Sequence, residues 1–289
     1  LDATVGAIEY PRMGMAYVNY LIAQRVAQDA KVVLSGTGGD EVTGGYVGRY
    51  AIVPRAAPAS LMRRALQRLR AGAAGRAASS DAFALYRASL NVPISAERIK
   101  DAFTPEFLRA AGGFDPLAAI GDAIGSVPSQ DPWDVIMHVD MTTYLPGLLA
   151  LEDKLSMAHS LEARVPLLDN ELVDYLLNVD WSLLSDGSTG KILFREAVRP
   201  LVPDTIYRKP KMGFGPPDAS WYRGILRSWI EEQLSESRIR QRGVLQYDFV
   251  RRILNEHFED RASHVALIWC LLSFESWCKQ HGAYGGALH

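Results

Sequence analysis

Residues 31–41 read KVVLSGTGGDE, and they indicate the fold class of this 289-residue chain. Lys31 is followed by the short apolar run 32–34, which is rich in branched side chains and predicts a buried strand. The strand stops at a glycine-rich segment that contains Asp40 and Glu41. Apolar residues at helical spacing predict a helix over residues 15–28. A helix, a buried strand and a glycine-rich loop in this order predict an α/β fold, in which ligands bind at the carboxyl ends of strands.

The remainder of the chain is predominantly helical in its pattern. Residues 134–162 predict a helix interrupted near Pro146-Gly147, and residues 191–198 predict a further helix. Residues 1–14 offer at most a fragment of a second strand. One parallel strand cannot satisfy its own backbone hydrogen bonds. We therefore expect the neighbouring strands to lie upstream or in another chain.

Composition and charge are those of a soluble globular protein. Hydrophobic residues make up 48% and charged residues 22% of the chain, which argues against disorder. The net charge of -2 gives no global basic field, so we expect no nucleic-acid partner. The arginine-rich residues 55–80 lack interleaved aromatics and indicate a solvated helix and loop. The apolar run at residues 265–272 is far shorter than the ~20 residues of a membrane span. With no signal peptide in view, we expect a cytoplasmic protein and no membrane partner.

The cysteines and histidines predict neither a disulfide nor a zinc site. Cys270 and Cys278 lie in a helix-like stretch, which would hold their side chains more than roughly 10 Å apart at about 1.5 Å of rise per residue. We expect two buried free thiols in a reducing compartment. His159 has no metal-ligand companion at helical spacing, and the other histidines are scattered. Its expected role is packing or surface contact.

The first candidate loop, residues 35–46, reads SGTGGDEVTGGY. Glycines after a strand allow backbone N–H groups to approach phosphate oxygens closely. The carboxylates of Asp40 and Glu41 suit a Mg²⁺ ion that bridges to phosphates. A structural turn accounts for the same pattern, so the loop by itself does not decide between the two.

Two further segments contain charged residues. Residues 208–217, RKPKMGFGPP, place three cations beside glycine and proline. A lysine there can stabilise charge on a phosphoryl group or an oxyanion, although a solvated basic loop has the same composition. Residues 151–169, LEDKLSMAHSLEARVPLLD, intersperse ionisable with apolar side chains. That pattern predicts buried or half-buried ion pairs whose role is structural more than catalytic.

Taken together, the three segments resemble the synthetase domain of asparagine synthetases. The motifs occur in that family's order, at plausible spacing, and the resemblance covers essentially the whole chain. The quoted residues are VLSGTGGDE (33–41) with GGY (44–46) for the second nucleotide-site loop, YLP (144–146), DKLSMA (153–158) and LEARVPLLD (161–169) for the central signature, KMGF (211–214) with Pro217 and Trp221 for the catalytic-lysine loop, and residues 267–277 for the closing helix.

The resemblance implies a fold and a division of the chain. The fold is an incomplete adenine-nucleotide α-hydrolase-like (ATP pyrophosphatase) parallel sheet with a predominantly helical remainder. Residues 1–55 would form the nucleotide-site strand and loop, residues 56–130 a helical insert, and residues 131–289 a helical part with the lysine loop.

The resemblance also implies a reaction and its residues. ATP activates a carboxylate as an acyl-adenylate with release of pyrophosphate, and an amine then attacks to give an amide and AMP. Lys211 would stabilise charge on the α-phosphate and on the tetrahedral intermediate. Asp40 would hold Mg²⁺ and pyrophosphate, with Glu41 supporting it. The residues that would bind and shape the pocket for ATP and the acyl-adenylate are Ser35, Gly36, Gly38 and Gly39.

Three departures from the family pattern stand out. The family's first pyrophosphate loop, Ser-Gly-Gly-x-Asp-Ser, does not occur in this sequence, nor does the glutaminase domain with its nucleophilic cysteine. We expect both as partners, in the same or another chain. Thr37 stands where asparagine synthetases place a glutamate thought to be a general base, and threonine cannot take that role near neutral pH. The β-lactam-forming relatives use a tyrosine and a distant glutamate, whereas this chain has Thr37 and Lys154.

Three hypotheses follow. The first is asparagine synthesis from aspartate, a small-molecule carboxylate substrate, with glutamine-derived ammonia. The second is a divergent amidotransferase or a peptide macrolactam cyclase on the same scaffold, which Thr37 favours. The third is a non-catalytic subunit. We expect the isolated chain to be inactive, because an ATP site without its phosphate loop cannot position the triphosphate.

Overall fold

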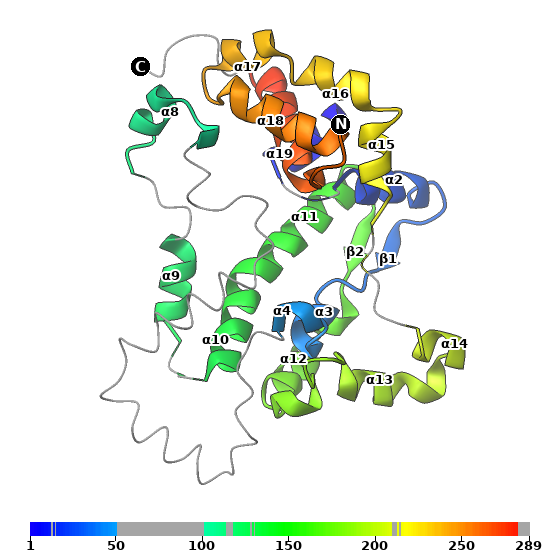
Figure 1. The fold of residues 1–289 in the computed structure, drawn as a ribbon. Helices are drawn as coiled ribbons and strands as arrows, with labels where there is room; N and C mark the ends of the chain where they lie inside the picture. Colours follow the sequence, from blue (N-terminus) through cyan, green and yellow to red (C-terminus); the bar gives the residue numbers. More distant parts are fainter. Residues whose placement is uncertain are drawn as a thin grey trace.

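The computed structural model describes residues 1–50 and 101–282, except 13, 15, 114–117, 128, 130, 210–212 and 214. This part is mostly helical, with one small parallel sheet, consistent with the predicted α/β class (Figure 1). Three predictions lie wholly or largely outside the described residues. They concern the arginine-rich residues 55–80, most of the helical insert 56–130, and Lys211.

The sheet pairs two strands from distant parts of the chain. β1 (Val32–Leu34) runs parallel to β2 (Glu162–Arg164), with Val33 opposite Ala163. The Ser35 N–H donates to the Arg164 carbonyl at 2.7 Å, which extends the ladder beyond β1. β2 therefore supplies one of the neighbours that were expected from outside the chain. In a parallel ladder alternate residues bond to the same neighbour, so the backbone groups of residues 32 and 34 face away from β2.

β1 is not the buried strand that its apolar sequence predicts. Val32 is 44% and Leu34 76% exposed. Val32 and Leu34 point to the same face of the sheet, and no described residue covers that face enough to bury them. The expected strand fragment in residues 1–14 is also wrong, because α1 (Asp2–Ile8) forms there and packs on α19 (Val265–Gln280).

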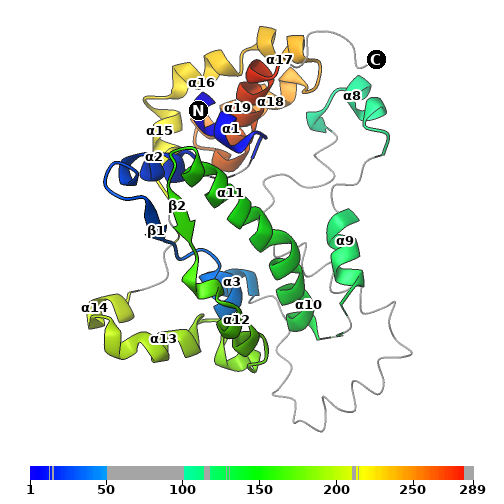
Figure 2. The same ribbon diagram turned by 180° about the vertical axis from the view of Figure 1, so that it is seen from behind.

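One long irregular helix forms the spine of the molecule (Figure 2). α10 (Pro132–Val139) continues through η1 (Asp140–Tyr144), a π-helical turn, into α11 (Leu145–Met157). The interruption predicted near Pro146-Gly147 is found as this π-helical turn, which ends at Tyr144 without breaking the helix. Pro146 is the second residue of α11 and cannot donate to a carbonyl of the preceding turn, and the helix is π-helical immediately before α11. The irregular turn precedes it, and the helix ends before β2 begins.

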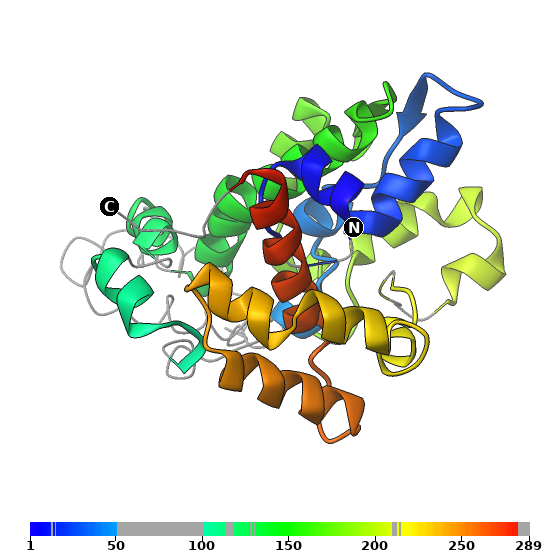
Figure 3. The ribbon, with the colours of Figure 1, turned by 90° about the horizontal axis from the view of Figure 1, so that it is seen from above.

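Three clusters of buried side chains hold the helices together. The largest lies among the C-terminal helices and includes Ile230, Ile253 and Ile268. Figure 3 shows these helices gathered around α19, with α1 beside it. A second cluster joins α10 to the segment after β1, and a third joins α1, α2, α11 and α19. The predicted helix over residues 15–28 is confirmed by α2 (Ala16–Val26), which precedes β1.

The remaining elements are short. They are α3 (Gly39–Thr43), α4 (Val47–Tyr50), α8 (Pro105–Ala110), α9 (Ala118–Gly125), η2 (Pro166–Leu168), α12 (Asn170–Leu177), η3 (Trp181–Leu183), α13 (Ile192–Val198), η4 (Arg199–Leu201), α14 (Asp204–Tyr207), α15 (Asp218–Arg223), α16 (Arg227–Gln233), α17 (Glu236–Arg242) and α18 (Tyr247–Phe258). α13 confirms the helix predicted over residues 191–198.

The charged residues of the central segment differ in burial: Glu152 and Lys154 are half-buried, and the others are exposed. Lys154 pairs with Glu9, and Arg164 pairs with Glu162 at 2.7 Å, with both partners of the second pair exposed. The prediction of buried or half-buried ion pairs is wrong for the Arg164 pair, because alternate residues of a strand point to opposite faces. Only Ala163 of β2 turns inward.

The thiols and His159 agree with their predicted structural roles. Cys270 and Cys278 are both free, the second buried and the first half-buried. The His159 ring lies 4.4 Å from the Tyr20 ring, edge to face, which is a packing contact. Across the described ranges, no helix combines the length and the apolar character needed to cross a bilayer.

Candidate functional site

The glycine-rich segment forms a tight turn at the carboxyl end of β1. The Ser35 hydroxyl donates to Thr37 Oγ1 at 3.1 Å and accepts from the Thr37 N–H at 3.2 Å. Gly38 has a φ of 87°, and a Cβ there would lie 2.5 Å from the Leu168 side chain. Glycine is therefore required at this position on two grounds. The turn brings together the predicted site residues 35–39.

Asp40 and Glu41, at the start of α3, take different directions. Consecutive helical residues are rotated by about 100°, so the two carboxylates cannot share a site on one helix face. Glu41 is 1% exposed, and its carboxylate accepts a hydrogen bond from the Tyr46 hydroxyl at 2.5 Å. The side chain of Asp40 is 25% exposed. Of the two carboxylates, that of Asp40 is accessible to a bound ion. That of Glu41 is buried and held by Tyr46.

Tyr46 keeps its proton and remains a hydrogen-bond donor. Burial, the hydrogen bond to Glu41 and the negative charge of that carboxylate raise the pKa of Tyr46 far above its usual range. The Tyr46 hydroxyl therefore remains a hydrogen-bond donor to Glu41 well above neutral pH.

Lys191 is a site residue that the sequence patterns did not single out. Its Nζ lies 3.1 Å from Asp40 Oδ1, so a cation from the start of α13 meets the reachable carboxylate. Lys191 has a φ of 57°, in the left-handed region that L-residues rarely occupy. It is also a cation at a helix N-terminus, where the dipole disfavours positive charge. A cation at the start of the helix predicted over residues 191–198 was the available signal, but it did not identify Asp40 as the partner.

The surrounding glycines leave room for this pair. A Cβ at Gly45 would lie 1.8 Å from Asp40 Oδ1 and 2.6 Å from Lys191 Cε. A Cβ at Gly190 would lie 2.5 Å from the Gly44 carbonyl oxygen. By contrast, a Cβ at Gly36 meets nothing within 4 Å, so the turn is open on that side.

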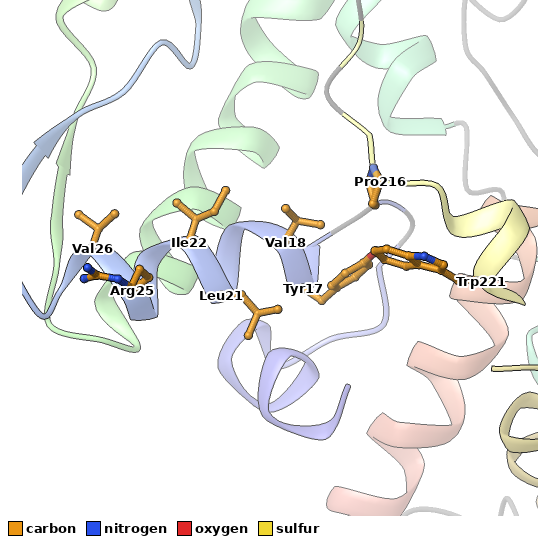
Figure 4. Close-up of a pocket in the computed structure, with 8 residues that line it drawn as sticks. All are labelled: Tyr17, Val18, Leu21, Ile22, Arg25, Val26, Pro216 and Trp221. Atoms are coloured by element: carbon orange, nitrogen blue, oxygen red, sulfur yellow. The ribbon is translucent and has the colours of Figure 1, made fainter. Parts of the chain in front are cut away.

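A separate apolar cavity of about 390 Å³ lies along α2, beside the segment that follows the lysine loop (Figure 4). None of the residues of the glycine-rich turn lines it. The Tyr17 hydroxyl donates to Asp218 Oδ1 at 2.5 Å, which ties α2 to α15. The lining residues are Tyr17, Val18, Leu21, Ile22, Arg25, Val26, Pro216 and Trp221.

A parallel strand, a glycine-rich turn at its carboxyl end and a carboxylate–lysine pair beside that turn define an α/β protein with a candidate phosphate-binding loop. The model of the asparagine synthase family matches residues 1–279. The chain belongs to this family, and the resemblance drawn from its motifs is confirmed.

Curated relatives match different shares of the chain. A putative glutamine-hydrolyzing asparagine synthetase of Mycobacterium tuberculosis is 30% identical over 274 residues, which are 89% of this chain and 40% of that protein. Asparagine synthetase 1 of Bacillus subtilis is 32% identical over 143 residues, 49% of this chain and 22% of that protein. A Penicillium rubens protein named amidase chyE is 28% identical over 112 residues, 37% and 17% of the two chains. The chain thus spans 40% of the length of the mycobacterial relative.

Proposed function

We propose that this chain is part of an ATP-dependent amide ligase that activates a carboxylate as an acyl-adenylate, with aspartate as substrate and asparagine as product. Membership of the asparagine synthase family supports a carbon–nitrogen ligase. The single observation that carries the proposal is the pairing of Asp40 with Lys191 beside the glycine-rich turn. A carboxylate and a cation at one such turn suit pyrophosphate with its metal ion.

The residues present fit a Mg²⁺–phosphate group. Mg²⁺ is commonly bound by one or two carboxylates together with substrate phosphates and waters, and Asp40 supplies one accessible carboxylate. The metal would neutralise the charge of the pyrophosphate. Lys191, already beside Asp40, would contact phosphate oxygens. Lys211 would stabilise charge on the α-phosphate and on the tetrahedral intermediate, as the family motif implies.

The turn residues would bind the nucleotide through the backbone and hydroxyl groups. Gly36 has no side chain to obstruct the open side of the turn, so a ligand can approach the backbone there. Because Ser35 donates to Thr37 Oγ1, the Thr37 hydroxyl proton is available to a ligand oxygen. Thr37 would therefore act as a donor that positions the acyl-adenylate, and it would not act as a base.

The open edge of β1 supports a further proposal about partners. The backbone groups of residues 32 and 34 face away from β2, and Leu34 is 76% exposed beside them. We assign this edge to a strand from an upstream segment, in the same or another chain, that brings the missing pyrophosphate loop and completes an adenine-nucleotide α-hydrolase-like sheet. A glutaminase domain would supply ammonia.

The second candidate is a divergent amide ligase, an amidotransferase or peptide macrolactam cyclase, on the same scaffold. The observation that favours it is Thr37, whose hydroxyl is bonded to Ser35 and cannot deprotonate an amine near neutral pH. Such an enzyme would take an attacking amine that is deprotonated by another group.

ATP–pyrophosphate exchange by the full-length gene product tests both candidates. Aspartate and a panel of other carboxylates and peptides are supplied one at a time. Exchange that depends on aspartate supports asparagine synthesis, and exchange only with another carboxylate supports the divergent ligase. Absence of exchange with every substrate, in a protein shown to be folded, would contradict ligase activity and favour a non-catalytic subunit.

A further inference from the structure

Asp140, a buried acidic residue on the spine helix, contacts the segment that follows the glycine-rich turn. Asp140 is the first residue of the π-helical turn η1 and is fully buried. Its Oδ1 accepts from Arg49 Nη2 at 2.6 Å, and its Oδ2 accepts from the Tyr50 hydroxyl at 2.9 Å. A buried carboxylate is stable only when paired and hydrogen-bonded. Asp140 therefore holds Arg49 and Tyr50, two residues of α4.

Arg49 extends the contact to two aromatic rings. Its guanidinium carbon lies 4.6 Å from the centre of the Tyr144 ring and 5.8 Å from that of Tyr46. Cations at these distances are attracted to the ring faces. The Tyr46 and Tyr144 rings meet edge to face at 6.1 Å. The Tyr46 hydroxyl in turn donates to Glu41, the neighbour of Asp40.

One turn of the spine helix supplies two members of this network. Asp140 and Tyr144 are the first and last residues of η1, and both contact Arg49. π-helical turns are rare and occur frequently at functional sites. In the views from front and behind, α3 lies beside the junction of α10 and α11, and α3 contacts η1 (Figures 1 and 2).

We propose that Asp140 is a positioning residue for Asp40, acting through Arg49, Tyr46 and Glu41 to set the orientation of α3. The inference rests on the proposed function in one respect, namely that Asp40 binds Mg²⁺ and pyrophosphate. Asp140 contacts neither the ion nor a substrate. Loss of its charge weakens its hold on Arg49 and Tyr50, Arg49 then shifts against the Tyr46 ring, and Glu41 and Asp40 lose their fixed direction.

The test compares Asp140→Asn with Glu275→Gln in the full-length protein. Glu275 is a matched control because its buried carboxylate also accepts from an arginine, Arg242, at 3.2 Å, but it lies in α19. Hydrogen–deuterium exchange of residues 38–46 is measured without ligand, and Mg²⁺–pyrophosphate affinity by calorimetry. In Asp140→Asn we expect about tenfold faster exchange and about tenfold weaker affinity, since a buried charged hydrogen bond is lost. Glu275→Gln lowers the melting temperature and changes neither readout.

A purely structural role gives a different result. If Asp140→Asn lowers the melting temperature but leaves the exchange of residues 38–46 and the pyrophosphate affinity at wild-type values, the proposal is overturned. Tyr50→Phe removes one of the two hydrogen bonds to Asp140, and we expect it to shift both readouts in the same direction by less. This variant carries the test if Asp140→Asn does not fold.

Two outcomes of this experiment distinguish failure of the positioning role from failure of the proposed function. If wild-type protein binds no Mg²⁺–pyrophosphate, the function fails, while the exchange of residues 38–46 still decides whether Asp140 orders the turn. If the wild-type protein binds pyrophosphate and Asp140→Asn binds it equally well, the positioning role fails and the function stands.

Discussion

Lys191 Nζ lies 3.1 Å from Asp40 Oδ1, which joins the start of α13 to the start of α3. Both side chains are partly exposed, and neither belongs to the buried core. A lysine with a φ of 57° carries a backbone cost of about 1–3 kcal/mol, so the site keeps it at the expense of stability. The pair is the centre of the proposed pyrophosphate site.

Replacement of Lys191 by methionine is expected to lower ATP–pyrophosphate exchange about 100-fold, because one donor to developing charge is lost. The loss falls on kcat and on the KM for pyrophosphate, measured by steady-state exchange kinetics. Lys279→Met is the control, since Lys279 also pairs with an aspartate, Asp2, at 2.7 Å, on the far α19. Wild-type exchange in Lys191→Met would remove this lysine from the site.

Gly45→Ala is expected to disable the site without unfolding the protein. The added Cβ would lie 1.8 Å from Asp40 Oδ1, so the carboxylate must move away. A displacement of about 1 Å at a reacting site can cost about 100-fold in rate. The measurement is exchange activity together with thermal unfolding.

Gly121→Ala controls for the added methyl group, because a Cβ at this position in α9 meets nothing within 4 Å. It should retain activity and gain about 0.5–1 kcal/mol in the free energy of unfolding, as expected for glycine in a helix. Equal activity in Gly45→Ala and Gly121→Ala would show that Asp40 need not occupy its observed position.

Stability is expected to fall in mild acid because of His257. This side chain is fully buried, and its Nδ1 accepts from the His264 N–H at 3.2 Å. Burial, followed by the nearby positive charges of Arg223 and His264, lowers the pKa of His257. The unfolded state, with a pKa near ~6.5, therefore binds the proton more readily than the folded state. The contribution of His257 to the free energy of unfolding is fully present above that pH, and it is lost as the pH falls below it.

Urea unfolding at pH 8 and pH 5 measures this loss. His257→Asn keeps an acceptor for the His264 N–H but cannot be protonated in this range. We expect the variant to be less stable than wild type at pH 8 and to have a flatter pH dependence between the two values. An unchanged pH dependence in His257→Asn would assign the acid sensitivity to other groups.

The open edge of β1 gives a prediction about the longer protein. If the added segment pairs with this edge and also covers the sheet face that carries Leu34, Leu34→Lys should destabilise the full-length protein by about 2 kcal/mol or more, the cost of exchanging buried apolar surface for a charge. The same change should barely affect the 289-residue chain alone, where Leu34 is 76% exposed. Ile225→Lys, at a comparably exposed position, is the control in both proteins. Equal effects of Leu34→Lys in the two proteins would contradict strand addition.

Local patterns predicted the elements whose cause is local. α2 follows from helical spacing, and the turn after β1 follows from glycines that the backbone requires, as Gly38 shows. β2 was missed because Glu162 and Arg164 are charged and only pairing with β1 makes the segment a strand. The exposure of β1 was missed because an apolar run reports the tendency to be buried and does not supply the covering partner.

The sequence likewise predicts only part of the candidate site. Ser35 to Asp40 could be selected from one contiguous stretch with a strand before it. Lys191 could not, because its role depends on a contact with Asp40 across the fold. Asp140 was also missed, since a single acid in a helix gives no sign of the π-helical turn or of the Arg49 contact that define its surroundings.

In the proposed reaction a carboxylate oxygen attacks the α-phosphorus of ATP, so the adenylyl group is transferred to the carboxylate and pyrophosphate leaves. Aspartate labelled with ¹⁸O in its carboxylates is supplied to the full-length protein with ATP and an ammonia source, and the products are analysed by mass spectrometry. An acyl-adenylate passes one carboxylate oxygen to the phosphate of AMP, so we predict one ¹⁸O atom in AMP and none in pyrophosphate. Recovery of the label in inorganic phosphate, with ADP as the nucleotide product, would contradict an acyl-adenylate intermediate.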